Sequence, residues 1–500
     1  MKPRVLPYAL LLFSFTSSVF AQWIHIRTVP IIASNQSQFQ PSLARGMGNL
    51  SIAFDDPLAD PFVNPAKANR LSGITLFSSP TRNSWSNENG RAISTAVGTS
   101  TYPGAAVSSI PFGGFIQRGR FFGGALVAYQ GFTGERSGTR FDFPITTEPR
   151  LAPRPAMRSD IGSNTYLFGL FGVNFPESNT SVAGSITWGK YGAMDGVNLL
   201  YPGSIDIKQD GWSLEYKLGI LGELTDNDRL EFVVGRSIMK ATHEVTYLGQ
   251  WGPFLPYRTE INKDESNEWL LHAAYRRAVG NGWKLGPSVT VNWKDHPKIP
   301  NYDLANIPRD PGRSIAYNIG IGAMRFGSGS MWGMEYIYEP ISSYTWAELG
   351  PGPLPIDPSP QLPPNFKTVE NFFDFSNHIF RIGVHTETNL DWLDYRLGAQ
   401  LHFYNYTLDQ FNNLSRTTRS METDWLETTL GGGLTARFAN VQLMYTLQLI
   451  LGNGLVGVET GVAPNAAAIR NDFLIAPSAD LVVDEITLVT QQLTFVYHLE

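Results

Sequence analysis

The 500-residue chain contains no cysteine. In an exported protein this excludes disulfide staples, thiolate metal sites and thiol catalysis. Charge is also scarce, since Asp, Glu, Lys and Arg make up 16% of the residues, against roughly a quarter in ordinary globular domains. The formal net charge of −6 argues against a nucleic-acid partner, which would require a basic face.

Long apolar runs are confined to the start of the chain. Lys2 and Arg4 precede a mostly apolar stretch from Val5 to Phe20, which ends at Ala21. This order of basic, apolar and small residues predicts a secretory signal over residues 1–21, cleaved near Ala21. No later stretch reaches the roughly 18 to 20 apolar residues that a spanning helix needs. The mature chain is therefore expected to lie outside the cytoplasm.

Polar and apolar residues alternate over long stretches, with the period of two that places successive side chains on opposite faces of a β-strand. From Trp212 to Leu218, one face carries Trp, Leu, Tyr and Leu, and the other carries Ser, Glu and Lys. The same alternation runs through 288–294, 441–449 and 492–499. Helical spacing is scarce, so the chain is predicted to be all-β.

The predicted strands exceed the five or so residues typical of soluble sheets; examples are 211–224, 229–248, 283–295, 330–346, 393–409 and 440–452. A tilted strand needs roughly 9 to 11 residues to cross a bilayer. Such strands must close into a barrel, because lipid offers no hydrogen-bond partner to a free edge. The sequence thus predicts a transmembrane antiparallel β-barrel in contact with outer-membrane lipid. A soluble sandwich or propeller is the alternative, but the chain has no repeat of about 40 to 50 residues that would indicate a propeller.

Short and long connections alternate, as they do between the two ends of outer-membrane barrels. Tight turns are expected at Gly119, 176–179, 225–228, 280–282, 327–330, 388–391 and 439–440. Long polar loops are expected at about 133–160, 194–210, 249–266, 296–312, 347–376, 410–424 and 453–485. Together with a first and a last strand, these turns predict about sixteen strands over residues 71–500, and fourteen stays open as an alternative.

Residues 22–70 do not have the pattern of barrel wall. They contain the run Ala44-Arg45-Gly46-Met47-Gly48-Asn49, then Asp55-Asp56, and finally Asn64-Pro65-Ala66. Their apolar residues, such as Ile52 and Phe62, favour packing over a free tail. The segment could trail in the periplasm or fold into the lumen as a plug.

These motifs resemble the N-terminal signature of FadL-like and PorV/PorQ-like outer-membrane proteins. The likeness covers residues 42–70, and the Arg-Gly-Met-Gly form is closer to the PorV/PorQ-type branch. The resemblance implies an N-terminal hatch inside a barrel, commonly of fourteen strands, in a superfamily of fatty-acid transporters and type IX secretion barrels. The hatch or gate residues that it implies are Arg45, Gly46, Met47, Gly48, Asp55, Asp56, Asn64 and Pro65.

Two features depart from that family. The predicted sixteen strands exceed its usual number. The chain also ends Tyr497-His498-Leu499-Glu500 instead of on the terminal aromatic residue that typical barrels present to the assembly machinery.

Some short patterns invite a chemical interpretation. Gly46-x-Gly48 lacks the flanking strand, helix and Lys-Ser/Thr of a phosphate-binding loop, so a turn that needs positive φ is the better interpretation. Asp55, Asp56 and Asp60 could bind a divalent cation, but capping and turn formation are favoured.

The eight histidines are scattered without metal-ligand spacing, and no G-x-S-x-G motif is present. His272 and Arg276 share the polar face of one strand, and His402 lies on the polar face of another. No catalytic residue, cofactor or metal site is therefore predicted. An enzyme site assembled from distant strands stays open as an alternative.

Two functions from different classes fit the sequence. The first is passive uptake of hydrophobic or amphipathic small molecules through the barrel, gated by the N-terminal segment. The second is a partner-binding barrel of a secretion or envelope assembly, with loops 347–376 and 453–485 as docking surfaces. The predicted lumen residues favour a wet or filled interior over a greasy tunnel; they are Ser213, Glu215, Lys217, Asn292, Lys294 and Gln448.

Overall fold

The computed structural model describes most of the chain after the predicted signal. The described residues are 39–86, 93–95, 98–140, 156–193, 206–248, 257–296, 299–301, 307–309, 312–348, 363, 366–452, 455–458, 481–484 and 487–499. The predicted signal over residues 1–21 lies outside these ranges. Among the described residues, no helix combines the length and the apolar character needed to cross a membrane.

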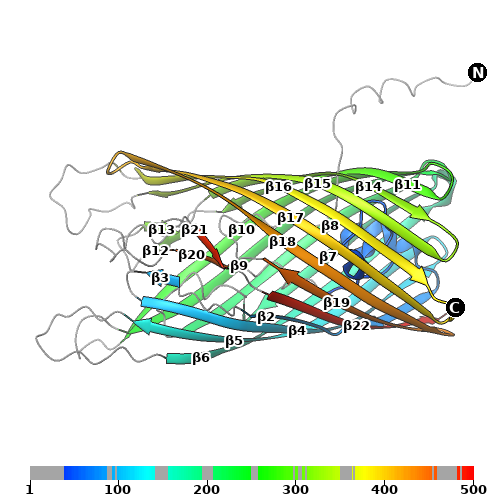
Figure 1. The fold of residues 1–500 in the computed structure, drawn as a ribbon, viewed down its shortest axis with the longest axis horizontal. Helices are drawn as coiled ribbons and strands as arrows, with labels where there is room; N and C mark the ends of the chain where they lie inside the picture. The colour runs from blue at the N-terminus through cyan, green and yellow to red at the C-terminus, as the bar shows by residue number, and fades with distance from the viewer. Residues whose placement is uncertain are drawn as a thin grey trace, which may run out of the picture.

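The strands form a closed antiparallel ring (Figure 1). β1 (Ile74–Ser78) and β2 (Thr81–Ser86) act as one interrupted wall strand, because both pair with β22 on one side and with β4 on the other. Leu76, for example, pairs with Tyr497 of β22 and with Gly114 of β4. The predicted count of sixteen wall strands is confirmed over the described residues.

The remaining wall strands follow in chain order, each paired with the next. They are β4 (Gly98–Arg118), β5 (Phe121–Arg140), β6 (Ala156–Phe175), β7 (Thr180–Tyr191), β8 (Asp206–Glu223), β9 (Asp228–Leu248), β10 (Tyr257–Ala278), β11 (Trp283–His296), β14 (Gly312–Phe326), β15 (Ser330–Glu348), β16 (Lys367–Glu387), β17 (Leu393–Asn412), β18 (Thr417–Phe438), β19 (Val441–Leu451) and β22 (Thr487–Leu499). Outside the ring, β3 (Ile93–Thr95) pairs with β4, β12 (Ile299–Asn301) pairs with β13 (Ile307–Arg309), and β20 (Leu455–Val458) pairs with β21 (Leu481–Asp484).

All seven predicted tight turns join neighbouring wall strands at one end of the ring. Several carry the positive φ that a short reversal demands, including Gly119 (63°), Asn179 (49°) and Ala439 (48°). β1 begins and β22 finishes at this same end. By the rule that short turns are periplasmic, this end is expected to face the periplasm.

The predicted long loops are partly wrong in extent. The stretch 410–424 is a tight hairpin, since β17 continues to Asn412, a turn follows with Arg416 at φ 55°, and β18 starts at Thr417. β5, β6, β10 and β16 likewise extend into the stretches predicted as loops. The stretches on β5, β6 and β10 and the 410–424 hairpin are mostly polar in sequence, so the period-two signal fades there. On β16, by contrast, Val369, Phe373 and Phe375 form an apolar inward face.

Apolar side chains point outward and polar ones inward, the reverse of a soluble protein. On β8, Leu218 is 53% exposed, whereas its neighbour Lys217 is 8% exposed. Asn292 and Gln448 are buried as predicted, and Leu443, Tyr445 and Leu447 are exposed between buried Met444, Thr446 and Gln448. The exposed apolar belt is the surface that lipid covers.

Tryptophans mark both edges of this belt. On β11, Trp283 lies near the short-turn end and packs edge-on against Trp332 at 5.1 Å. Trp293, ten residues along the same strand, stacks on Trp269 at 6.5 Å. Ten residues at roughly 3.3 Å each, tilted by about 40°, span about 25 Å, which is the height of the apolar band of an outer-membrane barrel.

Candidate functional site inside the barrel

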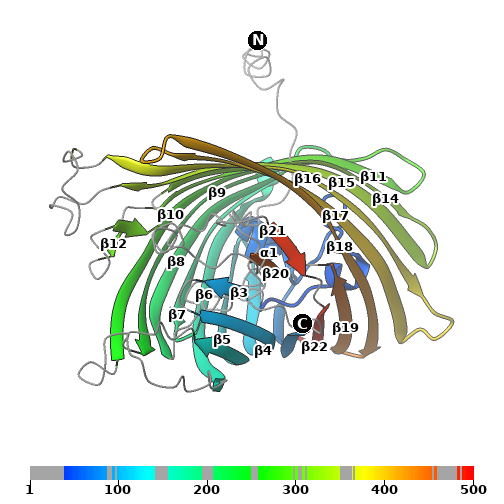
Figure 2. The same cartoon turned by 60° about the vertical axis from the view of Figure 1, so that its left-hand side comes forward.

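Residues 39–73, here termed the inner segment, lie within the ring of strands (Figure 2). They form three short helices: η2 (Ala44–Met47), α1 (Asp60–Val63) and η3 (Pro65–Arg70). Hydrogen bonds or ion pairs link the segment to β4, β8, β9, β10, β11, β15, β16, β17, β19 and β22. The segment therefore crosses the lumen at the level of these contacts.

Four glycines in neighbouring strands form a row under η2, here termed the glycine row. They are Gly333 of β15, Gly383 of β16, Gly398 of β17 and Gly431 of β18, each directly paired with the next. A Cβ atom on any of the last three would lie under 3.0 Å from the backbone of Arg45 or Met47. Only glycine lets two backbones approach this closely.

The predicted residues Arg45 to Gly48 lie on this row. Gly48 has φ 64°, and a Cβ there would come within 2.7 Å of backbone atoms of Ile382 and Ala399. Met47 is fully buried. Gly46 belongs to η2, so its role is the space it leaves beside Arg396 rather than a positive φ. Burial lowers the pKa of Arg45 to about 10, although Asp56 opposes the shift.

The turn at Ser51 is bound by strands on two sides. Glu335 of β15 accepts a hydrogen bond from the Ser51 amide at 2.5 Å and another from the Ile52 amide. Arg276 of β10 donates to the Ser51 carbonyl at 3.1 Å. Arg381 of β16 donates to the Ser51 hydroxyl at 3.3 Å and pairs with Glu335. This turn thus connects β10 to β15 and β16 through the inner segment.

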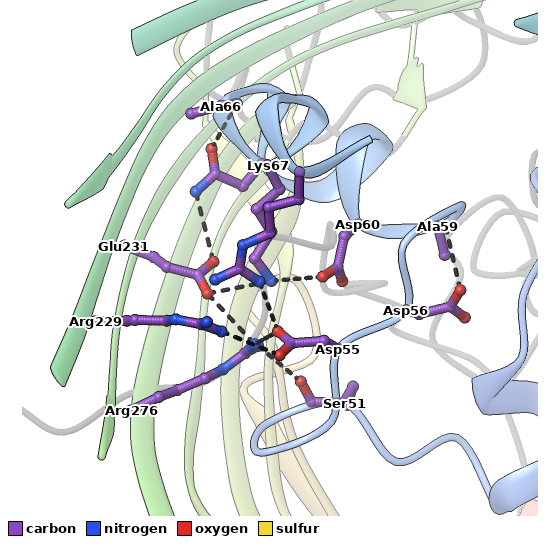
Figure 3. Close-up of polar contacts among 12 residues, drawn as sticks. Ser51, Asp55, Asp56, Ala59, Asp60, Ala66, Lys67, Arg229, Glu231 and Arg276 are labelled. Atoms are coloured by element: carbon purple, nitrogen blue, oxygen red, sulfur yellow. Dashed lines mark hydrogen bonds and ion pairs between the residues drawn. The ribbon is translucent and has the colours of Figure 1, made fainter. Parts of the chain in front are cut away.

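Acidic and basic side chains meet between the inner segment and β8–β11, in what we term the ionic cluster (Figure 3). It comprises Asp55, Asp60, Lys67 and Arg70 of the inner segment with Glu223, Arg229, Glu231, Arg276 and Lys284 of the wall. Asp55 is its centre. It pairs with Arg70 at 2.8 Å, Lys284 at 3.0 Å, Arg229 at 3.3 Å and also Arg276.

The two inner-segment carboxyls of the ionic cluster, Asp55 and Asp60, have pKa values shifted in opposite directions. Burial alone would raise the pKa of Asp55, but Arg276, Arg70 and Lys284 outweigh it and hold that pKa well below its usual range. Burial raises the pKa of Asp60 to about 6 against the attraction of Lys67. Lys67 lies 3.0 Å from Asp60 and 3.1 Å from Glu231.

The third aspartate, Asp56, fastens the inner segment to itself. Its carboxylate accepts hydrogen bonds from the Leu43 amide at 2.7 Å, the Ala44 amide at 3.1 Å and the Ser42 hydroxyl at 3.0 Å. The Ala59 amide adds a fourth donor. Asp55, Asp56 and Asp60 therefore engage separate partners, which confirms the capping role at Asp56 and disagrees with a shared cation site.

Asn64 and Pro65 lie against β8. The Asn64 side chain caps η3 by accepting from the Ala66 amide at 3.1 Å and donates to the Ile220 carbonyl at 3.2 Å. Pro65 occupies the first turn of η3, where its missing amide hydrogen costs nothing. Both residues contact the space above Gly219, where a Cβ would collide with them.

An apolar contact completes the attachment on the remaining part of the ring. Phe62 of α1 packs against Phe168 of β6 at 4.6 Å, Phe115 of β4 at 5.8 Å and Phe77 of β1 at 6.4 Å. Leu58 and Phe39 join the same buried cluster. The inner segment is thus bound by charge, by backbone fit and by aromatic packing on different parts of the wall.

The outer half of the lumen is more apolar than the sequence predicts. Inward side chains of β14–β18 form one cluster, here the Phe373 cluster: Ala316, Ile341, Val369, Phe373, Phe375, Tyr406, Leu408, Met421 and Trp425. Inward side chains near β19, β22 and β2 form another, here the Trp85 cluster: Trp85, Ala105, Val107, Phe132, Ala193, Ile450 and Leu488. The expectation of a polar interior is therefore wrong at this height, because the residues chosen for it lie on other strands or lower in the wall.

The sequence placed Lys217, Arg276 and Gln448 on the inward face of the wall, and all three bind the inner segment, but it did not identify them as its partners. Glu231, Arg276, Lys284 and Glu335 carried one weak signal, since each is a charged residue on the inward face of a strand. The glycine row carried another, because glycine is depleted inside strands. Neither signal shows which strands are neighbours. Among the described residues, no group of three or more metal-binding side chains is present.

Comparisons with known proteins give only structural likenesses. No family model matches the chain, and no curated protein matches it. The Ralstonia pickettii toluene transporter TbuX matches over 92% of this chain and 98% of its own, with 12% identity and a TM-score of 0.41. The Pseudomonas putida toluene transporter TodX matches over 91% and 97%, with 10% identity and a TM-score of 0.41. A Pseudomonas aeruginosa FadL homologue matches over 92% and 98%, with 11% identity and a TM-score of 0.43. At this level of likeness no residue role transfers to this chain.

Proposed function

We propose that this chain is a passive outer-membrane channel for apolar or amphipathic small molecules, with the inner segment as its gate. The observation that carries the proposal is the apolar lining of the outer half of the lumen. A water-filled pore for polar solutes would line that space with charged and polar groups. Here, two apolar clusters line much of it, on β14–β18 and on the wall near β19, β22 and β2, beside a few inward polar residues such as Ser343 and Asn371.

Apolar inner walls favour apolar solutes for a simple physical reason. Each square ångström of apolar surface that leaves water contributes about 25 cal/mol. A small hydrocarbon that enters between the two clusters would transfer most of its surface. Concave, mostly apolar sites with few polar groups are typical of such ligands.

The gating role rests on the position of the inner segment. Polar contacts bind it to ten wall strands, and apolar contacts reach β1, β4 and β6. A solute that passes from the apolar clusters to the short-turn end must therefore pass this segment. A rearrangement of residues 39–73, rather than of the wall, is the movement that would open the path. The docking loops of the partner-binding alternative lie mostly outside the described residues, which omit 349–362 and 364–365 of loop 347–376 and include only 455–458 and 481–484 of loop 453–485.

The test is a flux measurement in asymmetric bilayers whose outer leaflet is lipopolysaccharide, which apolar probes cross slowly by themselves. The wild-type protein should speed uptake of an apolar dye while it conducts few ions. Deletion of residues 42–66 should raise ion conductance, provided that the barrel still shows different gel mobility when boiled and unboiled. Dye uptake equal to that of protein-free bilayers would reject the proposal. So would a wild-type ion conductance equal to that of the deletion.

A further inference from the structure

The Phe373 cluster contains an aromatic site that the gate does not use. Tyr406 of β17 lies beside its strand partner Phe375, with ring centroids 5.0 Å apart. Phe373 is 6.1 Å away and Trp425 of β18 is 6.4 Å away. Trp425 also stacks on Tyr404 at 4.8 Å with only 11° between the rings. These residues present an aromatic inner surface well above the glycine row.

The Tyr406 hydroxyl is the exceptional group in this site. Tyr406 is 1% exposed, and its hydroxyl has no hydrogen-bond partner among the described residues. By contrast, two tyrosines of the apolar cluster that contains Phe39 and Leu58 have hydrogen-bond partners: Tyr166 donates to Gln130 at 2.9 Å, and Tyr191 is 2.7 Å from the Ser213 hydroxyl. A buried hydroxyl without a partner destabilises the empty protein, so such groups call for a specific explanation.

We infer that Tyr406 is the hydrogen-bond donor of a ligand subsite. The ligand class is a small molecule with an apolar, preferably aromatic, body and one oxygen that accepts the Tyr406 proton. Phe373, Phe375 and Trp425 would contact the body, and the hydroxyl would select the oxygen. The inference rests on the proposed function in one respect: the molecule reaches the site through the outer half of the lumen.

A matched pair of probes isolates the hydroxyl. Acetophenone and ethylbenzene have nearly the same size and shape, but only acetophenone carries an acceptor oxygen. Binding of each probe is measured by calorimetry on full-length protein in lipid nanodiscs, for wild type and for Tyr406→Phe. For each probe, the affinity of wild type is divided by that of Tyr406→Phe. Partition of the probe into lipid is the same for both proteins and cancels in this ratio.

Tyr406→Phe is expected to lower the affinity for acetophenone about tenfold, which is the effect of one buried hydrogen bond. The affinity for ethylbenzene should stay unchanged. The unliganded variant should be at least as resistant to heat as wild type, because it loses an unsatisfied group. Tyr166→Phe is the control: it loses a satisfied hydrogen bond, so it should become less heat-resistant and keep wild-type affinity for acetophenone.

Equal acetophenone affinity in wild type and Tyr406→Phe would overturn the inference, as would an equal loss for both probes. A less heat-resistant Tyr406→Phe would also overturn it, because the hydroxyl would then have a structural partner. Flux separates this result from the proposed function. If dye is taken up but acetophenone binding does not depend on Tyr406, the proposed channel function stands and the subsite is rejected. If binding depends on Tyr406 but no dye is taken up, the subsite stands and the channel function is rejected.

Discussion

The inner segment is held in two physically different ways on neighbouring parts of the ring. Along β8–β11, it is bound by the ionic cluster, where Asp55 alone contacts four cations. Along β15–β18, Glu335 and Arg381 bind the Ser51 turn, and the glycine row adds a seat where the backbone of Arg45 and Met47 lies against the wall without any side chain between them. Ionic attachment responds to salt and pH, whereas steric fit responds to neither.

This difference indicates which side can release the segment. A carboxylate can be protonated or displaced, and its partners remain in place. The glycine row cannot be released in this way, because glycine has no side chain that could be protonated or displaced. We therefore expect the segment to pivot about the glycine row when it opens and to separate first from β8–β11.

Filling the glycine row should give the largest effect. In Gly431→Leu, the first added atom would already collide with the Arg45 carbonyl. Overpacking typically costs about 1–3 kcal/mol and more against rigid backbone, so the segment should leave its seat. Ion conductance in planar bilayers should then rise toward that of the variant lacking residues 42–66.

The neighbouring residue provides a matched control for that variant. Gly432 lies on the same strand, but its nearest neighbour for an added Cβ is a Leu397 side-chain atom at an ordinary 3.6 Å. Gly432→Leu should therefore keep the low conductance of wild type. If Gly431→Leu and Gly432→Leu have the same ion conductance, the glycine row does not hold the inner segment, and the contrast between steric and ionic attachment is wrong.

Removing the central charge of the ionic cluster should have the next largest effect. Asp55→Asn leaves Arg70, Arg229, Arg276 and Lys284 without their shared anion. Loss of one partner from a fully buried ion pair costs about 3–5 kcal/mol, and the loss should be smaller here because the Asp55 side chain is 26% exposed. The weakening should appear as frequent channel openings in planar bilayers. Glu177→Gln, in an exposed pair with Arg120, is the control that should behave as wild type.

The wall could be predicted from the sequence because its signal is local. Lipid on one side and lumen on the other impose alternation on each strand separately, as in Trp212 to Leu218, and the tight turns then count the strands. The prediction failed at 410–424 because the sequence there is mostly polar, with Phe411, Leu414 and Met421 as its apolar residues, and so shows little alternation. The alternation of polar and apolar residues does not show how far a strand extends beyond the bilayer.

Of the candidate site, the sequence could predict the inner-segment residues but not most of their partners on the wall. Arg45 to Gly48, Asp55, Asp56, Asn64 and Pro65 stand in one compact run, so the sequence presents them together. Their partners are spread over strands hundreds of residues away; Gly431 reaches Arg45, and Glu335 reaches Ser51. Finding these pairs requires strand order and register, which a single strand's pattern does not contain. The Phe373 cluster escaped prediction for the same reason.

Acidification should tighten the ionic side. The pKa of Asp60 is about 6 in the seated segment, against an ordinary value of 3.8. A carboxyl with a raised pKa favours the seated state at low pH, and this advantage is lost as pH rises through about 6. Channel openings should therefore be rarer at pH 5 than at pH 7.5, because the seated state gains about 1.4 kcal/mol, or roughly tenfold in population.

Asp60→Asn tests this assignment, since the amide resembles the protonated acid. The variant should open as rarely at pH 7.5 as wild type does at pH 5. The depressed pKa of Asp55 acts in the opposite direction, but only below its ordinary value of 3.8, outside this window. An unchanged pH profile in Asp60→Asn would assign the dependence to another group.

Removing one cation should have the smallest effect and shows how evenly the ionic cluster shares its charge. Lys284→Met deletes a contact of 3.0 Å to Oδ2 of Asp55. Arg229 still pairs with that Oδ2 atom, and Arg70 and Arg276 still pair with Oδ1. Because the carboxylate stays paired, the expected loss is below about 1 kcal/mol, seen as a slight rise in openings that salt enhances. A loss as large as that of Asp55→Asn would mean that Lys284 carries the ionic attachment by itself, and the contrast between a shared charge and a steric seat would have to be redrawn around one residue.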